Sequence, residues 1–274
     1  MTFARDPNND DAAADCHIDT WACADDCDVR SFSLVRQCDV RGLLHCHTDY
    51  AGGAHPLRSI VDTARALELD YLGVTDKAKI DDADEGLCLE GIAYQRSEIR
   101  ELNEEFKDLV LLHGIEIEAT VDGSLPLPDH VLDEFDYVVA TLKDDHGLDA
   151  AGFTARALRV IMNPFVNILG HPCGDWMTTC SGVPLDLETI LTAAAKAEVA
   201  VEIDANPCHV DLDWTHCAKA QEHGVTLIIA SDAHRAARLA DYRHGVELAR
   251  QAGLCCRQIL NTRPLDDVRA FFNR

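Results

Sequence analysis

Basic residues are scarce in this sequence, and acidic residues outnumber them by two to one. The chain has 24 Lys+Arg against 48 Asp+Glu, which gives a formal net charge of -24. Such a negative field repels phosphate backbones, so the charge disfavours nucleic acid as a partner. Only 6 of the basic residues are lysines, so a lysine at a functional position is informative.

Long apolar runs are missing as well. No stretch approaches the roughly 20 residues that a membrane span needs. Residues 1–16 are polar and acidic and contain no apolar segment of a signal peptide. The 12 cysteines therefore do not indicate a secreted disulfide scaffold. We expect a cytoplasmic chain with mostly free thiols and no membrane partner, and we find no signal for an oligomeric state.

Hydrophobic periodicity is weak in residues 1–35, which are rich in Asp, Asn and Ala. We predict an acidic, weakly ordered leader at 1–35, followed by one barrel domain at 36–274. A small zinc site in the leader is the alternative, although its cysteines form no C-x2-C pair. The residues that would make that site are Cys16, His17, Cys23 and Cys27.

From residue 40 onward, short apolar runs alternate with helical patterns. Such runs are typical of parallel strands that are buried on both faces. Repeated crossovers give either a doubly wound sheet or a barrel, and the lack of a G-x-G-x-x-G turn disfavours the doubly wound sheet. The predicted strands are 43–47, 70–75, 109–118, 137–142, 166–170, 199–203 and 225–230. The main predicted helices are 57–67, 93–106, 151–162, 187–197, 214–223, 242–252 and 265–273.

Ionisable residues follow or end nearly every predicted strand. In a parallel barrel these ends meet at one face, where active sites are built, so the pattern favours a barrel. In the H-x-H pair of His45 and His47, strand alternation predicts that both imidazoles point to the same side. Asp232 and His234 repeat the spacing after the last strand.

Imidazole with carboxylate groups is the ligand set of Zn, Mn or Fe. A carboxylate such as Glu116 can bridge two ions, which would activate water and hold a phosphoryl group. A single histidine at a strand end is more often a capping or core residue, so the prediction depends on the whole set meeting at one face. The candidate ligands are His45, His47, Glu116, His171, Asp232 and His234.

Several segments resemble a known family in sequence and in order. They are RGLLHCHTDYAGG (41–53), LDYLGVTDKA (69–78), LLHGIEIEATVDGSLPLPDHVLDEFDYVVATLK (111–143), ILGHPCG (168–174), VEIDANPCHVDL (201–212) and ASDAHRAARLADYRHGV (230–246). Over residues 36–274 they resemble the PHP (polymerase and histidinol phosphatase) domain, and most of all the C-terminal PHP domain of bacterial family-X DNA polymerases. Without a polymerase domain, a free-standing version is expected.

The resemblance implies a distorted seven-stranded (β/α) TIM-like barrel with up to three metal ions and phosphoesterase activity. It implies that His45, His47 and Asp232 belong to the first metal site and that Glu116 bridges to the second. By the same resemblance, His171 belongs to the second site and His234 to the third.

The sequence departs from the family at several ligand positions. Lys77 and Lys143 replace histidines, and Ala51-Gly52-Gly53 lacks a further ligand. We hypothesise that the two ammonium groups fill the vacated third and second sites, because unpaired buried carboxylates are costly. One divalent ion (Zn, Mn or Fe) rather than three, or none, would remain. The alternative is that both are ordinary exposed loop lysines.

Three functions remain open at this point. The first is a hydrolase with a reduced metal site that acts on a small phosphoester, with Lys77 or Lys143 holding phosphoryl oxygens. Asn206 and His209 are candidate substrate contacts, although His209 and Asp175 stand where relatives often carry arginines. The second is an inactive PHP-like protein that binds a ligand or partner. A DNA-end exonuclease is third, and the net charge argues against it.

Overall fold

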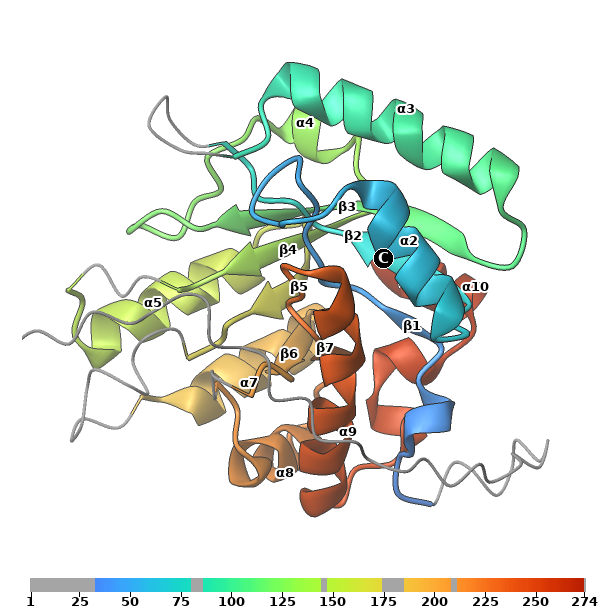
Figure 1. Cartoon of the computed structure of the whole chain (residues 1–274). Helices are drawn as coiled ribbons and strands as arrows, with labels where there is room; N and C mark the ends of the chain where they lie inside the picture. The colour runs from blue at the N-terminus through green and yellow to red at the C-terminus, as the bar shows by residue number, and fades with distance from the viewer. Residues whose placement is uncertain (1–32, 80–85, 144–146, 174–184, 208–210, 274) are drawn as a thin grey trace, which may run out of the picture.

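A seven-stranded parallel sheet, curled into a nearly closed barrel, forms the centre of the molecule (Figure 1). The computed structural model describes residues 33–79, 86–143, 147–173, 185–207 and 211–273. The strands follow one another in chain order around the sheet. They are β1 (Gly42–Leu43), β2 (Tyr71–Val74), β3 (Val110–Glu118), β4 (Tyr137–Thr141), β5 (Val166–Gly170), β6 (Ala200–Asp204) and β7 (Leu227–Ala230). The predicted α/β class and TIM-like barrel are confirmed.

Helices lie around the outside of this sheet (Figure 1). They are α2 (Leu57–Ala66), α3 (Leu89–Glu105), α4 (Asp129–Leu132), α5 (Ala150–Ile161), α7 (Leu187–Ala197), α8 (Trp214–Glu222), α9 (Tyr242–Gln251) and α10 (Leu265–Phe272). Each long helix buries one stripe of apolar side chains. In α2 the buried residues Leu57, Ile60, Val61 and Ala64 recur at helical spacing. Within the described residues, no helix is long and apolar enough to cross a membrane.

Tyr137 fills the interior of the barrel. A Cβ added to Gly73 would lie 1.9 Å from the Tyr137 hydroxyl oxygen, so only glycine leaves room for the ring there. That hydroxyl donates a hydrogen bond to the Leu44 carbonyl over 2.9 Å. Phe272 of α10 stacks on the Tyr137 ring with centroids 4.7 Å apart. Because α10 packs against the strand interior from the N-terminal end, the opposite mouth is left for polar residues.

The first strand is shorter than the sequence predicted. We expected a strand at 43–47, but β1 ends at Leu43. Beyond it the chain makes contacts on both sides: Thr75 N–H donates to the Cys46 carbonyl, and His47 N–H donates to the Ala233 carbonyl. A bridge between Cys46 and Ala233 therefore brings the first strand's extension against the segment after β7. The two segments that carry the histidine pair and Asp232 are adjacent for this reason.

The described chain begins next to the barrel. Val35 is buried, and its N–H donates to the Leu254 carbonyl over 3.0 Å. The cysteines and histidine of the predicted leader, Cys16 to Cys27, lie outside the described residues. The boundary at residue 35 stays a prediction.

Candidate metal centre

Strand alternation places carboxylates at the C-terminal mouth of the barrel. Glu116 follows Leu112 and Gly114 on the inward face of β3, and Glu202 follows Ala200 on the inward face of β6. Both carboxylates are almost fully buried. The interior is therefore apolar at one end and acidic at the other, where active sites of parallel barrels are found.

Two residues of the cluster have left-handed backbone conformations. His171 directly follows β5 with φ 47, and Asp232 lies just after β7 with φ 42. Left-handed backbone at a non-glycine residue costs roughly 1–3 kcal/mol and recurs at functional sites. The strands thus end in sharp turns at the residues whose side chains enter the cluster.

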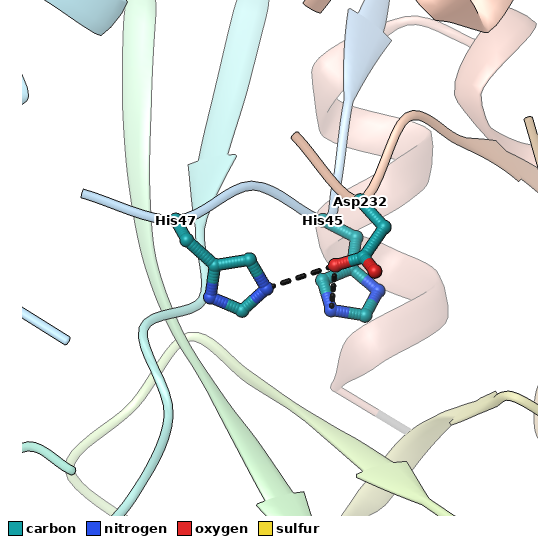
Figure 2. Close-up of side chains that lie close together, drawn as sticks. All are labelled: His45, His47 and Asp232. Atoms are coloured by element: carbon teal, nitrogen blue, oxygen red, sulfur yellow. Dashed lines mark hydrogen bonds and ion pairs between the residues drawn. The ribbon is translucent and has the colours of Figure 1, made fainter. Parts of the chain in front are cut away.

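His45, His47 and Asp232 form the centre of this cluster (Figure 2). The Asp232 Oδ1 atom lies 2.9 Å from His47 Nε2 and 3.5 Å from His45 Nε2. Glu116 Oε2 lies 3.4 Å from His47 Nε2 and 3.9 Å from His45 Nε2. Residues more than a hundred positions apart in the chain therefore present nitrogen and oxygen atoms to one small volume.

The donor atoms of this group fit a divalent cation. Metal–ligand bonds of about 2.0–2.2 Å keep the ligands of one ion within about 4.4 Å of one another, and all four distances above are shorter. His45 Nε2 and Glu116 Oε2 are buried and have no hydrogen-bond partner among the described residues. Buried polar atoms are normally satisfied, so these two call for an explanation, and a bound Zn, Mn or Fe ion would supply one.

Glu202 orients His45. Its Oε2 atom lies 2.6 Å from His45 Nδ1, which leaves Nε2 facing Asp232 and Glu116. Burial alone would lower the pKa of His45, but the negative charges of Glu202 and Asp232 raise it to about 10. In the metal-free protein His45 is therefore protonated at neutral pH, and a cation bound at Nε2 must displace that proton.

Burial and neighbouring charges also shift the pKa values of His47 and Glu116. Burial lowers the pKa of His47 to about 4, so its ring is neutral at pH 7. Burial alone would raise the pKa of Glu116, but the Lys143 ammonium and the nearby histidines hold it well below its usual range. A neutral imidazole and an ionised carboxylate are the forms that bind metal.

Lys143 lies beside Glu116. Its Nζ atom is 3.1 Å from Glu116 Oε1 and 3.9 Å from Asp232 Oδ2, and 34% of its side chain is exposed. Burial alone would lower the pKa of Lys143, but the charges of Glu116 and Asp232 raise it, so the group stays cationic. The ammonium thus touches the cluster on one side and reaches solvent on the other.

Within the part of the chain that the structure describes, Lys77 does not pair with a carboxylate. Its backbone bridges to Glu116, and its side chain and the His47 ring both flank Gly52. No carboxylate of the described chain is within ion-pair distance of its ammonium group. His234 is 38% exposed, and its ring lies 4.3 Å from that of His47. The role of Lys77 in a vacated third site stays a prediction.

His171 lies beside the second carboxylate oxygen of Asp232, and its ring centroid is 6.0 Å from that of His45. Its Nε2 atom is 3.7 Å from Asp232 Oδ2, and its Nδ1 atom is 2.7 Å from Asp211 Oδ2. Asp204 Oδ2 lies 3.9 Å from the same Nδ1. Burial and the negative charge of Glu202 raise the pKa of Asp204 to about 8.

The predicted substrate contacts are only partly described. Asn206 is half-buried, and its amide oxygen lies 3.4 Å from Arg238 Nη2. His209 and Asp175 lie outside the described residues. Arg238, on the 3-10 helix Ala236–Asp241, was not predicted as a cation near strand six.

Sequence reasoning also missed three carboxylates that contact the histidines. Glu202 and Asp204 stood at the end of a predicted strand but were given no role, although their spacing repeats that of His45 and His47. Asp211 gave no signal, because its place beside His171 depends on the loop that follows β6.

Fold and cluster together define a class, namely a parallel β/α barrel that carries imidazole and carboxylate groups at its C-terminal mouth. No family model matches the sequence. The chain is 34% identical over 85% of its length to the DNA polymerase/3'-5' exonuclease PolX of Bacillus subtilis (strain 168). It spans only 41% of that protein. It is 27% identical over 80% of its length to a protein of Thermoanaerobacter sp. (strain X514) named a probable phosphatase, and covers 90% of it.

Among solved structures, the chain resembles the histidinol phosphate phosphatase of Lactococcus lactis, which was crystallised with Zn, L-histidinol and phosphate. The TM-score is 0.60 at 19% identity, over 77% of this chain and 94% of that one. At this identity the likeness concerns the fold. The sequence relatives confirm the resemblance of this chain to the PHP domain that the motifs indicated.

Proposed function

We propose that the protein is a metal-dependent phosphoesterase that hydrolyses a small phosphorylated compound at one intact metal site. His45, His47, Glu116 and Asp232 would hold the ion. The relatives named as phosphatases and the zinc in the Lactococcus structure support this class of chemistry.

One observation carries the proposal. The two histidines and two carboxylates are buried and face each other at 2.9 to 3.9 Å, and two of their atoms have no hydrogen-bond partner among the described residues. Burying such groups without a counter-ion is costly, because each charged or polar atom has lost its water. A divalent cation would remove that cost and would supply Lewis-acid chemistry and water activation.

Other residues of the chain would orient the metal ligands and hold the substrate. Glu202 holds the His45 ring in the orientation that directs Nε2 into the cluster. The partly exposed ammonium of Lys143 can hold a phosphoryl oxygen of an incoming substrate while it stays close to Glu116. Asn206, Lys77 and His209 stay candidate substrate contacts.

The alternative function is a catalytically inactive PHP-like protein that binds a ligand or partner. The ion pair of Lys143 with Glu116 favours it, because the ammonium already neutralises one carboxylate of the cluster. The exonuclease activity in the name of the Bacillus relative is disfavoured for this chain. Its charge of -24 opposes the approach of a DNA strand.

Hydrolysis of p-nitrophenyl phosphate by metal-free protein, with and without added Mn²⁺ or Zn²⁺, tests the proposal. We expect turnover only with metal, loss of that turnover in His45→Ala, and full turnover in His244→Ala, which changes an exposed histidine on α9. Lys143→Met should raise KM more than it lowers kcat. Absence of turnover with every metal, or turnover that His45→Ala leaves intact, would rule the hydrolase out.

We also propose that the protein works in a reducing compartment such as the cytoplasm. Its seven described cysteines, four of them buried, are all free thiols, as is usual for chains that are kept reduced.

A further inference from the structure

The chain around His47 is held from two sides. On one side, the His47 N–H donates a hydrogen bond to the Ala233 carbonyl over 2.9 Å. On the other side, Thr48 donates to the Asp76 carboxylate, with its N–H at 2.6 Å and its hydroxyl at 2.5 Å. Thr48 and Asp76 are both fully buried. Because Thr48 directly follows a candidate metal ligand, the place of the Asp76 carboxylate helps to determine where the His47 backbone lies.

Asp76 is held in turn by a side chain of an outer helix. Gln95 of α3 is fully buried, and its Nε2 atom donates to Asp76 Oδ2 over 2.5 Å. A buried carboxylate that loses such a donor is destabilised, because no water replaces the lost hydrogen bond. The Gln95 amide therefore fixes the carboxylate that the Thr48 backbone needs.

His113 determines which way the Gln95 amide points. If the amide were turned over, its oxygen instead of its NH2 group would face Asp76. His113 Nε2 lies 3.1 Å from Gln95 Oε1, and His113 Nδ1 accepts from Arg96 Nε over 3.5 Å. Burial and the charge of Arg96 lower the pKa of His113 to about 3, so the ring is neutral at pH 7. We therefore assign its proton to Nε2, which donates to the amide oxygen and leaves the NH2 group for Asp76.

This connection reaches from the outside of the barrel to its mouth. Leu112 and Gly114 face the interior of the barrel, so His113 between them faces outward, where α3 packs against β3 (Figure 1). Asp76 follows β2 and lies at the C-terminal ends of the strands. A helix that supplies no candidate metal ligand is therefore joined, through buried polar contacts, to the segment that carries the histidine pair.

We infer that Gln95 and His113 are positioning residues for the metal site. They hold the carboxylate of Asp76, and that carboxylate holds the turn after His47. The inference rests on the proposed function, since the position of His47 matters for binding only if an ion is bound there. Groups that orient metal ligands typically change affinity by about 10–100-fold, and Gln95, which acts through other residues, belongs at the lower end.

Zn²⁺ affinity tests this without reference to turnover. Metal-free protein is titrated with Zn²⁺ near pH 7 in competition with a chromophoric chelator, and stability is measured by urea denaturation. Gln95→Met keeps the length of the side chain but removes both hydrogen bonds, and it should weaken the tightest equivalent by about 10-fold. Asn103→Leu is the matched control. Asn103 also lies on α3 and bonds twice to the backbone of Leu111, so this variant should lose stability but keep the affinity for Zn²⁺.

A double-mutant cycle shows whether Gln95 acts through the proposed connection. Thr48→Val removes the hydroxyl at the other end and keeps the shape of the side chain. If Gln95→Met and Thr48→Val interrupt the same connection, the double variant should lose less affinity than the product of the two single losses. Losses that simply multiply would show that Gln95 affects the metal by another route, and would overturn the inference.

A further variant covers the case in which Gln95→Met does not fold. Gln95→Glu keeps the acceptor for His113, but its carboxyl donates to Asp76 only while it is protonated. Its Zn²⁺ affinity, relative to the wild type at the same pH, should therefore be lower at about pH 8 than at about pH 6. Wild-type affinity in both Gln95 variants overturns the positioning role and leaves the metal site standing. A wild type that binds neither Zn²⁺ nor Mn²⁺ overturns both.

Discussion

Buried carboxylates determine the orientation and charge of the histidines at the barrel mouth. Glu202 holds His45, and Asp211 holds His171, each through Nδ1 at 2.6 and 2.7 Å. In both cases the other ring nitrogen is directed to Asp232. This is how metal-binding histidines are usually fixed, because a carboxylate on one nitrogen sets the tautomer and raises the basicity of the other.

Glu202→Gln should therefore weaken metal binding by roughly 10–100-fold, because the amide no longer stabilises the required orientation and charge of His45. Calorimetric titration of metal-free protein with Zn²⁺ measures the change. Glu222→Gln, which makes the same replacement at an exposed position of α8, should leave affinity unchanged. Equal affinity in both variants would mean that His45 is oriented by something else.

Asp76 lies in the family-like segment 69–78, and its carboxylate is hydrogen-bonded to other parts of the chain. It accepts hydrogen bonds from the Thr48 N–H at 2.6 Å, the Thr48 hydroxyl at 2.5 Å and the Gln95 amide at 2.5 Å. Burial raises the pKa of Asp76 to about 7. Asp76 thus ties the segment after the histidine pair to α3.

This pKa predicts a pH dependence of stability. The folded pKa lies above the unfolded value near 3.8, so the contribution of Asp76 is fully present below about pH 4. It is lost as pH rises through about 7. Asparagine cannot ionise at this position. The free energy of unfolding of Asp76→Asn, relative to that of the wild type, should therefore rise by on the order of 2–4 kcal/mol as pH rises through this range. Thermal melts of metal-free protein from pH 4 to 8 measure this, and parallel curves for the two proteins would contradict it.

At the level of elements, hydrophobic periodicity was sufficient to predict most strands and helices. The segments β3, β5, α5 and α7 lie within a residue or so of their predicted ranges, because each buries a regular apolar pattern. β1 was predicted too long, since the extended chain at residues 44–47 changes pairing partners instead of continuing one ladder. That exchange depends on contacts with the far end of the chain, which a local pattern does not contain.

Arg156 connects an outer helix to the C-terminal end of the barrel. It is the largest fully buried side chain of the described residues. Its Nη2 bonds to Glu118 at 2.9 Å and to the Ala119 carbonyl, and its Nε bonds to the Thr120 carbonyl at 2.9 Å. It thereby fixes the end of β3 against α5, two residues from Glu116.

Arg156→Met should lower the free energy of unfolding by roughly 3 kcal/mol, because carbonyl and carboxylate acceptors lose their donor in a buried place. Urea denaturation measures the loss. Arg58→Ala breaks an ion pair with Glu105 in which both side chains are about half exposed, and it should cost at most about 1 kcal/mol. Similar losses in the two variants would show that burial of Arg156 contributes little.

For the whole molecule, the sequence predicted that distant groups would meet at one mouth, and the coordinates bring His45, Glu116, His171 and Asp232 together. Parallel strands make that inference possible, since their ends must lie at one face. Sequence alone could not predict the pairing of Lys143 with Glu116, the separation of Lys77 from the carboxylates of the described residues, or the place of Asp211. These depend on side-chain directions and loop paths that no spacing rule determines.

We propose above all that the cluster of His45, His47, Glu116 and Asp232 binds a divalent cation. Titration of metal-free protein with Zn²⁺ near pH 7, by calorimetry in two buffers of different ionisation enthalpy, tests it most directly. We predict at least one bound ion and release of at least one proton, since the pKa of His45 is raised to about 10 and Zn²⁺ must displace its proton. In His45→Ala both signals should disappear from the first site. Absence of binding in the wild type, or equal binding in His45→Ala, would contradict the account.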